Sequence, residues 1–116
     1  MIDNNALLPL RQVVKDFDLK AKKSLGQNFI YDENITDKIA KLADLSSHVP
    51  VLEVGPGPGG LTRALLKTDV PHVTAVEQDE RCLRALKDLE SKAKGRLRLV
   101  KADALKWTMD IPSFDI

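Results

Sequence analysis

The sequence predicts an α/β fold built on a parallel β-sheet with helices on its faces. From residue 51 onward, short apolar runs typical of strands alternate with amphipathic stretches typical of helices. Such alternation requires crossover connections, which join parallel strands. The predicted strands are residues 51–54, 73–77 and 96–100, and residues 113–116 resemble the start of a fourth.

Two helices are predicted before the first strand. In the first helix, apolar side chains recur at spacings of three and four along one stripe, which comprises Leu7, Leu10, Val14 and Phe17. Pro9 would stand in its first turn, where a missing N–H costs little. In the second helix, Asp32 is expected to cap the amino terminus, and the expected buried stripe is Ile35, Ile39 and Leu42.

Two more helices are predicted between the strands. The stretch LTRALLK (61–67) follows directly from a glycine-rich run. The stretch DERCLRALKDLE (79–90) begins at a capping aspartate, Asp79, and directs Cys82, Leu86 and Leu89 inward. Successive strands then lie side by side, with the first strand in the middle of the sheet, and ligands bind beyond the carboxyl ends of the strands.

The composition of the 116 residues fits one globular domain, with 43% hydrophobic and 30% charged residues. A net charge of +1 excludes a general attraction to nucleic acid, so any such attraction must come from local clusters. The single cysteine, Cys82, excludes an internal disulfide and fits a reducing compartment. No metal-ligand spacing occurs in the sequence. No segment has the roughly 20 apolar residues of a membrane span, so a cytoplasmic protein is expected.

The stretch VLEVGPGPGGLT (51–62) is typical of a loop that binds a nucleotide cofactor. Gly55, Gly57 and Gly60 fit the dinucleotide pattern G-x-G-x-x-G. Glu77 ends the second strand roughly 20 residues later, where a carboxylate can accept hydrogen bonds from a ribose diol. Both NAD and S-adenosylmethionine contain such a ribose, so these two features leave both cofactors open.

Three further features together favour S-adenosylmethionine over NAD. The pattern E-x-G-x-G-x-G is motif I of S-adenosylmethionine-dependent methyltransferases, and it is formed by Glu53, Gly55, Gly57 and Gly59. Pro56 and Pro58 remove two N–H donors that a pyrophosphate would use. Asp103, after the third strand, can accept a hydrogen bond from an adenine amino group. Taken singly, the glycine loop also fits a tight turn, Glu53 a solvated strand residue and Asp103 a helix cap. Taken together, these features predict a Rossmann-like methyltransferase fold.

The segment KKSLGQNFIYDENI (22–35), followed by LEVGPGPGGLT (52–62), resembles the ribosomal RNA adenine dimethyltransferase family. The resemblance runs from about residue 8 to the end of the chain. It implies S-adenosylmethionine-dependent dimethylation of two adjacent adenosines near the 3′ end of small-subunit (16S) ribosomal RNA, in the precursor of the ribosomal subunit. The alternatives are a large-subunit adenine methylase, a non-catalytic nucleic-acid-binding relative and a nicotinamide oxidoreductase.

The resemblance also implies the residues of a cofactor site, and clusters of basic residues indicate where RNA could be bound. The implied cofactor residues are Gln27, Asn28, Ile30, Gly55, Gly57, Glu77, Asp103 and Ala104. Lys22 and Lys23, beside Lys20, are expected to contact RNA phosphates. A second basic cluster is expected to be mainly a solvated face, and it comprises Lys92, Lys94, Arg96, Arg98 and Lys101.

In this family the catalytic Asn-Leu-Pro-Tyr-type motif follows the fourth strand, so by resemblance it would lie beyond Ile116. The chain is therefore expected to be the N-terminal part of a longer methyltransferase domain. Residues 1–31 would form the N-terminal helix and the segment that covers the cofactor, and residues 32–116 would begin the core. Without the catalytic motif and the C-terminal RNA-binding helical domain, such a piece would be inactive and would leave one edge of its first strand unpaired.

Overall fold

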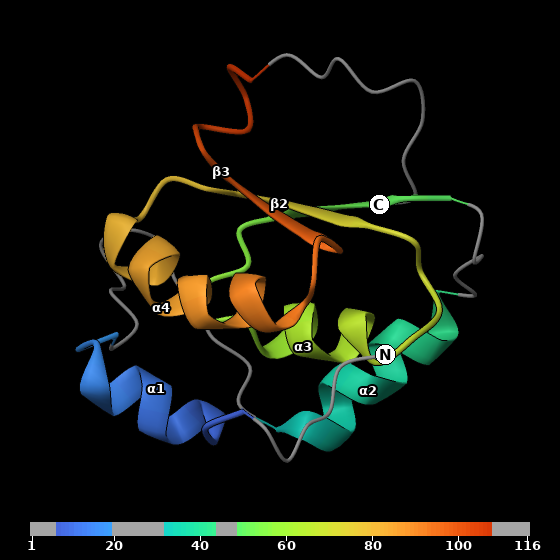
Figure 1. The fold of residues 1–116 in the computed structure, drawn as a ribbon, viewed down its shortest axis with the longest axis horizontal. Coiled ribbons are helices and arrows are strands. Elements are labelled where there is room, and N and C mark those ends of the chain that lie inside the picture. Colours follow the sequence, from blue (N-terminus) through green and yellow to red (C-terminus); the bar gives the residue numbers. More distant parts are fainter. Residues whose placement is uncertain (1–6, 20–31, 44–48, 108–116) are drawn as a thin grey trace.

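The protein is described by a computed structural model that covers residues 7–19, 32–43 and 49–107. Its centre is a parallel sheet of three strands: β1 (Val51–Val54), β2 (Val73–Glu77) and β3 (Leu97–Lys101). The strand order is β1-β2-β3, so β2 is central (Figure 1). The first three predicted strands are confirmed to within one residue, whereas the fourth, predicted at residues 113–116, lies outside the described residues. The expected central position of the first strand is not found among the described residues, where β1 lies at an edge.

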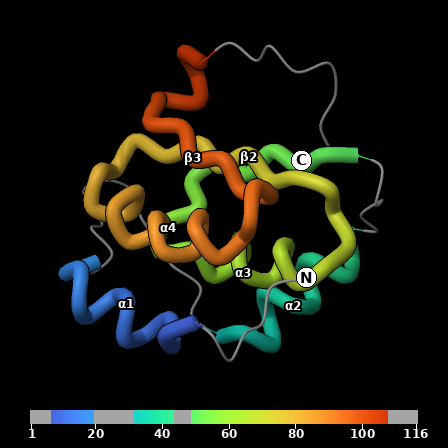
Figure 2. The backbone as a smooth tube through the Cα atoms, viewed as in Figure 1, coloured from blue at the N-terminus to red at the C-terminus, as the bar shows by residue number. Residues whose placement is uncertain are grey.

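The four helices of the described residues lie on the same side of the sheet (Figures 1 and 2). They are α1 (Leu10–Asp16), α2 (Glu33–Leu42), α3 (Gly60–Leu66) and α4 (Glu80–Lys92). Both crossovers, β1 to β2 and β2 to β3, step in the same direction across the sheet. Right-handed crossovers that step in one direction must place their helices on one face, which explains why α3 and α4 share a face.

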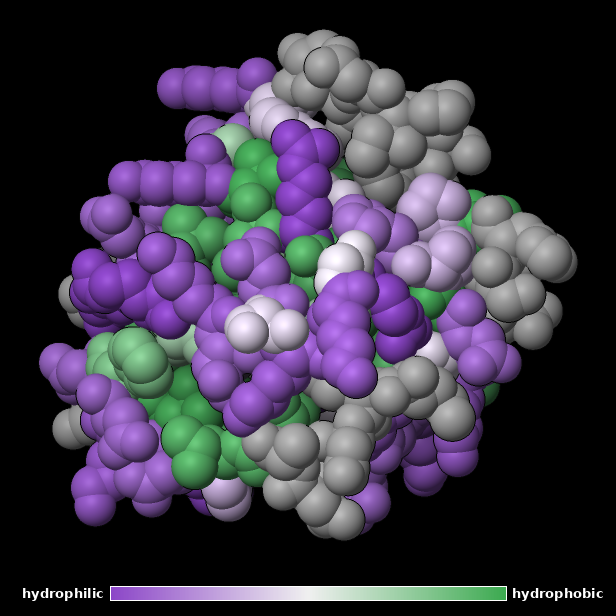
Figure 3. Space-filling model, in the orientation of Figure 1, coloured by the Kyte–Doolittle hydropathy of each residue, from purple (hydrophilic) through white to green (hydrophobic). Residues whose placement is uncertain are grey.

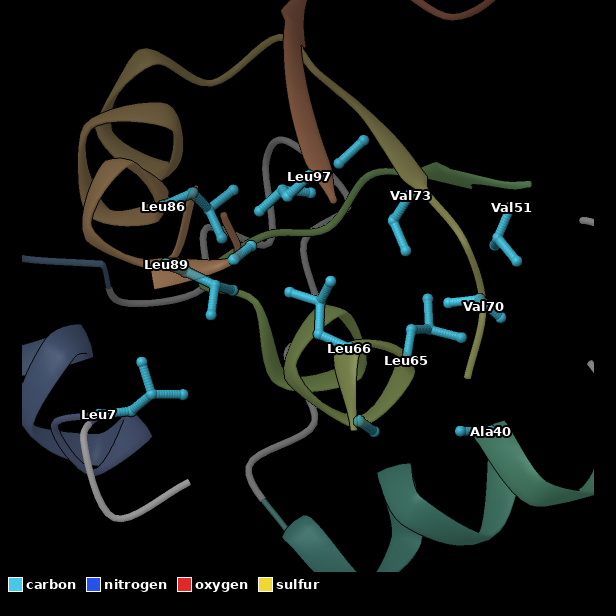
Figure 4. Close-up of a cluster of buried hydrophobic side chains, with 13 residues drawn as sticks. Leu7, Ala40, Val51, Leu65, Leu66, Val70, Val73, Leu86, Leu89 and Leu97 are labelled. Carbon is cyan, nitrogen blue, oxygen red and sulfur yellow. The ribbon is translucent and has the colours of Figure 1, made fainter. Parts of the chain in front are cut away.

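The main core lies between the sheet and the two helices α3 and α4 (Figure 4). Its largest fully buried side chains are Leu66, Leu86, Val70 and Val73. Removing an aliphatic side chain of this size from water stabilises a fold by about 1.5–3 kcal/mol. The prediction that Cys82, Leu86 and Leu89 face inward from α4 is confirmed, as is the Asp79 cap, whose carboxylate accepts a hydrogen bond from the N–H of Arg81 at 2.9 Å.

The predicted burial of α2 is wrong, although its predicted cap is confirmed. Asp32 accepts a hydrogen bond from the N–H of Asn34 at 2.9 Å. The expected stripe is exposed, by 48%, 38% and 83% for Ile35, Ile39 and Leu42. The buried residues are instead Thr36 and Ala40. The reason is that α2 packs on α3 and not on the sheet, and small side chains allow two helices to approach closely.

The first helix also differs from its prediction in part. Leu7 is buried as expected, but Val13 takes the innermost place on α1 and Phe17 is 40% exposed. Pro9 is the N-cap and not a first-turn residue. Val13 and the fully buried Leu19 pack against Cys82 and Ala85 of α4, and this contact fixes α1 at the amino-terminal end of α4. None of the helices described is long and apolar enough to cross a membrane.

Arg96 ties the end of α3 to the start of β2. Its guanidinium donates hydrogen bonds to three backbone carbonyls, those of Leu66 at 3.0 Å, Thr68 at 2.8 Å and Val70 at 2.8 Å. These carbonyls belong to the last turn of α3 and the connection that follows, and carbonyls at the end of a helix have no donor within the helix. Arg96 therefore has a structural role, and its assignment to a solvated basic face is wrong.

We expect Arg96→Met to lower the free energy of unfolding by about 2–3 kcal/mol, because it removes several charge-assisted hydrogen bonds while keeping the apolar stem. Arg98→Met, on an exposed side chain of the same strand, is the matched control and should change stability by less than about 0.5 kcal/mol. Urea unfolding monitored by circular dichroism measures both. Equal midpoints for the two variants would contradict the role of Arg96.

Candidate cofactor site at the strand tips

The carboxyl ends of the three strands meet at one edge of the sheet. The N–H of Gly55, just after β1, donates to the carbonyl of Val76 at 2.9 Å. The N–H of Ala102, just after β3, donates to the carbonyl of Glu77 at 3.1 Å. The structure therefore brings the glycine loop, Glu77 and the segment that carries Asp103 and Ala104 to neighbouring strand tips.

Gly55 and Gly59 of the loop require glycine for different structural reasons. Gly55 has a φ of +70°, and a Cβ placed on it would meet nothing within 4 Å, so its surroundings leave room for a ligand. Gly59 has a φ of +101°, and a Cβ placed on it would lie 2.6 Å from Cδ2 of Leu86. Because Leu86 is fully buried, it cannot move away cheaply. Gly59 thus permits α3 and α4 to pack, whereas Gly55 permits close approach to the backbone.

Glu77 organises the strand tips through its carboxylate. One oxygen, Oε1, accepts a hydrogen bond from the N–H of Gly57 at 3.0 Å, and the other, Oε2, accepts one from the N–H of Asp79 at 2.9 Å. The side chain is only 8% exposed. An ionised carboxylate has about four lone-pair sites, so Glu77 retains capacity to accept from further donors such as hydroxyls.

Glu53 is a second buried carboxyl beside the loop. It is 7% exposed, and its Oε1 accepts a hydrogen bond from the hydroxyl of Thr62 at 2.6 Å. Burial raises the pKa of Glu53 to about 7; the hydrogen bond from Thr62 lowers it and the negative charge of Glu77 raises it further. The alternative interpretation of Glu53 as a solvated strand residue is therefore wrong.

Asp103 shapes the turn after β3. Its Oδ1 accepts a hydrogen bond from the N–H of Leu105 at 3.0 Å, and its carbonyl accepts from Lys106 and Trp107. This is the capping role that the sequence left open for it. Asp103 and the following Ala104 are both half-buried, so both reach solvent at the edge where the other strand tips lie.

The sequence did not predict the roles of two residues of this region, Thr62 and Arg81. Thr62 carries no signal by itself, because only the fold brings its hydroxyl to Glu53. Arg81 has one signal, its position two residues after the capping Asp79. Its guanidinium forms an ion pair with Asp79 at 2.7 Å and donates to the carbonyl of Asp18 at 3.1 Å. Arg81 thereby joins the end of α1 to the turn that follows Glu77.

Several predicted residues lie outside the described part of the chain. They are the implied cofactor residues Gln27, Asn28 and Ile30 and the basic residues Lys20, Lys22 and Lys23. In the second basic cluster, Lys92 pairs with Asp88 at 3.0 Å and Lys101 lies 3.6 Å from Glu80. The surface around α4 is largely hydrophilic (Figure 3), which is consistent with a solvated face.

The functional groups at the strand tips favour one class of ligand. Carboxylates of Glu53, Glu77 and Asp103 offer acceptors and negative charge. Pro56 and Pro58 contribute no N–H to the loop. The described residues contain no group of three side chains suited to a metal ion. A cation that carries hydroxyl and amino donors fits this edge, whereas a pyrophosphate would meet repulsion and few donors.

Comparison with known proteins decides the family. A family model described as ribosomal RNA adenine dimethylase matches residues 18–114. The chain belongs to the ribosomal RNA adenine dimethylase family. A relative from Brucella anthropi, ribosomal RNA small subunit methyltransferase A, is 56% identical over 102 residues, which cover 88% of this chain and 36% of the relative. The chain thus spans about a third of the length of the curated relatives it matches.

Solved structures confirm the Rossmann-like methyltransferase fold expected for this family. The 23S rRNA methyltransferase ErmE has a TM-score of 0.64 and 34% identity, covering 75% of this chain and 35% of that protein. The glycopeptide N-methyltransferase MtfA, complexed with S-adenosyl-L-methionine, has a TM-score of 0.55 and 28% identity, covering 65% of this chain and 32% of that protein. These proteins share the α/β core of the chain.

We expect Gly59→Ala to lower the free energy of unfolding by about 2–4 kcal/mol, because it combines an unfavourable φ with a clash in the core. Gly55→Ala is the matched control, and only the cost of its positive φ, about 1 kcal/mol, should appear. Urea unfolding of the two variants measures the difference. A loss for Gly55→Ala as large as that for Gly59→Ala would contradict the open surroundings of Gly55.

The raised pKa of Glu53 predicts a dependence of stability on pH. Since the folded-state pKa of about 7 exceeds the ordinary 4.5, the proton stabilises the fold fully below about pH 4.5, and this contribution is lost as the pH rises through 7. Glu53→Gln keeps a neutral side chain at all pH values. Its stability relative to the unmodified protein should therefore rise by on the order of 3 kcal/mol between about pH 5 and pH 8.

Urea unfolding at several pH values measures this difference. The control is Glu80→Gln, because the side chain of Glu80 is 65% exposed and its removal should shift stability little with pH over that range. A difference between Glu53→Gln and the unmodified protein that stays constant from pH 5 to pH 8 would show that Glu53 titrates normally.

Proposed function

We propose that the chain forms the S-adenosylmethionine-binding part of an enzyme that dimethylates two adjacent adenosines near the 3′ end of small-subunit ribosomal RNA. The observation that carries the proposal is the convergence of the glycine loop, Glu77 and Asp103 at neighbouring strand tips. Membership of the ribosomal RNA adenine dimethylase family supports the RNA substrate. The name of the similar Brucella anthropi protein supports the small subunit.

Each part of the cofactor would meet a different strand tip. The backbone at Gly55 and Gly57 would approach the methionine portion, because Gly55 leaves open space there. Glu77 would accept hydrogen bonds from the ribose hydroxyls, and Asp103 with Ala104 would face the adenine. Bound S-adenosylmethionine would supply an electrophilic methyl group, and the protein would hold and orient it.

The remaining assignments extend the proposal to residues outside the described part. Gln27, Asn28 and Ile30 would cover the methionine end of the cofactor, and Lys22 and Lys23 would contact RNA phosphates. We assign residues 1–31 to this covering segment with its preceding helix, and residues 32–116 to the start of the methyltransferase core. The working location would be the cytoplasm, on the precursor of the small ribosomal subunit.

A second candidate substrate is large-subunit ribosomal RNA. The similarity to the 23S rRNA methyltransferase ErmE, at 34% identity, favours it. Labelled S-adenosylmethionine, offered with either small or large subunits that lack the modification, distinguishes the two candidates. Label in the small-subunit RNA would support the first proposal, and label in the large-subunit RNA would support the second.

We expect S-adenosylhomocysteine to raise the melting temperature of the protein, while NAD at the same concentration leaves it unchanged. The physical reason is that the carboxylates at the strand tips repel a pyrophosphate, whereas ligand binding to the folded state stabilises it. Gly55→Ala should weaken the effect of S-adenosylhomocysteine at least tenfold in ligand concentration, since its Cβ occupies the open space. Stabilisation by NAD alone would favour a nicotinamide oxidoreductase.

A further inference from the structure

Two buried carboxyl groups face the same side of the sheet below the glycine loop. Glu53 on β1 is paired in register with Ala75 on β2, and Glu77 lies two residues beyond Ala75 on that strand. Side chains two apart on a strand project from one face, so Glu53 and Glu77 both project toward the helices. They are 7% and 8% exposed. Burying two like charges together is costly unless a proton or a cation compensates one of them.

The described neighbours of Glu53 provide no such cation. From α3, the neutral hydroxyl of Thr62 donates to Glu53, while the guanidinium of Arg63 on the same helix donates to the carbonyl of Leu8. From β2, the charged neighbour is Glu77, whose oxygens accept, among the described residues, from the backbone N–H groups of Gly57 and Asp79. Neither glutamate takes part in an ion pair among the described residues.

His72 is a further titratable group next to these strands. It precedes β2 at the amino end of the sheet, where its carbonyl accepts from the N–H of Val51, and so it lies at the end opposite to Glu77. The pKa of His72 is lowered by burial and by Arg98. His72 therefore supplies no positive charge at the strand tips. Within the described part of the chain, a proton or a bound ligand is left to compensate the negative charge of Glu53 and Glu77.

We propose that Glu53 is a specificity-determining residue that senses the charge of the bound ligand: it loses its proton when the sulfonium form binds and keeps the proton when the thioether form binds. The proposal rests on the proposed function, since it takes S-adenosylmethionine as the cofactor. The sulfonium cofactor carries one positive charge more than S-adenosylhomocysteine, its product after methyl loss. The extra charge compensates an ionised Glu53, and its disappearance after methyl transfer makes ionised Glu53 unfavourable again.

This behaviour favours exchange of product for fresh cofactor. Ionised Glu53 strengthens binding of the cation, while no corresponding gain exists for the neutral product. Because the pKa of Glu53 lies at about 7 before binding, the group is about half protonated at neutral pH and can respond in either direction. Glu53 acts through charge and needs no contact with the reacting methyl group.

Calorimetric titration in two buffers of different ionisation enthalpy tests the proposal by counting protons. At pH 7 we expect the intact protein to release about half a proton on binding S-adenosylmethionine and close to none on binding S-adenosylhomocysteine. Glu53→Gln should abolish this difference. It should also reduce the preference for S-adenosylmethionine over S-adenosylhomocysteine by about tenfold at pH 8, which corresponds to one pKa unit of coupling.

Glu80→Gln is the matched control, because it removes an exposed carboxylate and should leave both proton counts unchanged. Equal proton release for the two ligands, or a difference that survives in Glu53→Gln, would overturn the inference and leave the proposed function standing. If neither ligand binds the unmodified protein, the proposed function fails and the inference fails with it. If Glu53→Gln does not fold, Thr62→Val provides a second variant, which should raise the proton release with S-adenosylmethionine at pH 8.

Discussion

The hydrogen bonds that the Glu77 carboxylate accepts from Gly57 and Asp79 are the constraint on which the site depends. One side chain thereby fixes two loops that belong to different crossovers, the glycine loop after β1 and the turn that starts α4. Parallel pairing alone would bring the strand ends to one edge, but it would leave the loops beyond them free to vary. The carboxylate sets their relative position, and it does so in a buried place where a charge-assisted hydrogen bond is strong.

The same arrangement concentrates negative charge beneath the glycine loop. Glu53 lies on the neighbouring strand, and its burial beside Glu77 raises its pKa to about 7. A charged group is buried without an ion-pair partner only when other interactions compensate its desolvation. Here Thr62 compensates part of it through one hydrogen bond, and among the described residues no cation supplies the rest, which leaves a proton or a positively charged ligand. The polarity of the site therefore discriminates between the two candidate cofactors more strongly than the glycine pattern does, because glycine patterns occur with either of them.

Local signals in the sequence predicted the elements well and their packing less well. The strands at 51–54 and 73–77 and the caps Asp32 and Asp79 depend on neighbouring residues, and the structure confirms them. The prediction of the buried face of α2 was wrong because that face depends on which element the helix packs against. The packing partner is a property of the tertiary structure and has no local signal in the sequence. Arg96 was assigned to the surface for a similar reason: its acceptors, such as the carbonyl of Leu66, lie some 30 positions earlier in the chain. No spacing rule connects such residues.

Among the candidate site residues, the positions of those on strand tips were predictable because parallel topology fixes where strand ends meet. The convergence of Gly55 and Glu77 follows from this rule, whereas the proposed role of Asn28 rests only on resemblance to a family. The structure nevertheless bounds the segment that contains Asn28. Leu19 is fully buried against α4, and Arg81 binds the carbonyl of the preceding Asp18, so the segment starts beside the turn that follows Glu77. It ends at Asp32, which caps α2. The contacts of the described residues on either side are therefore what the structure contributes to the proposal for Asn28.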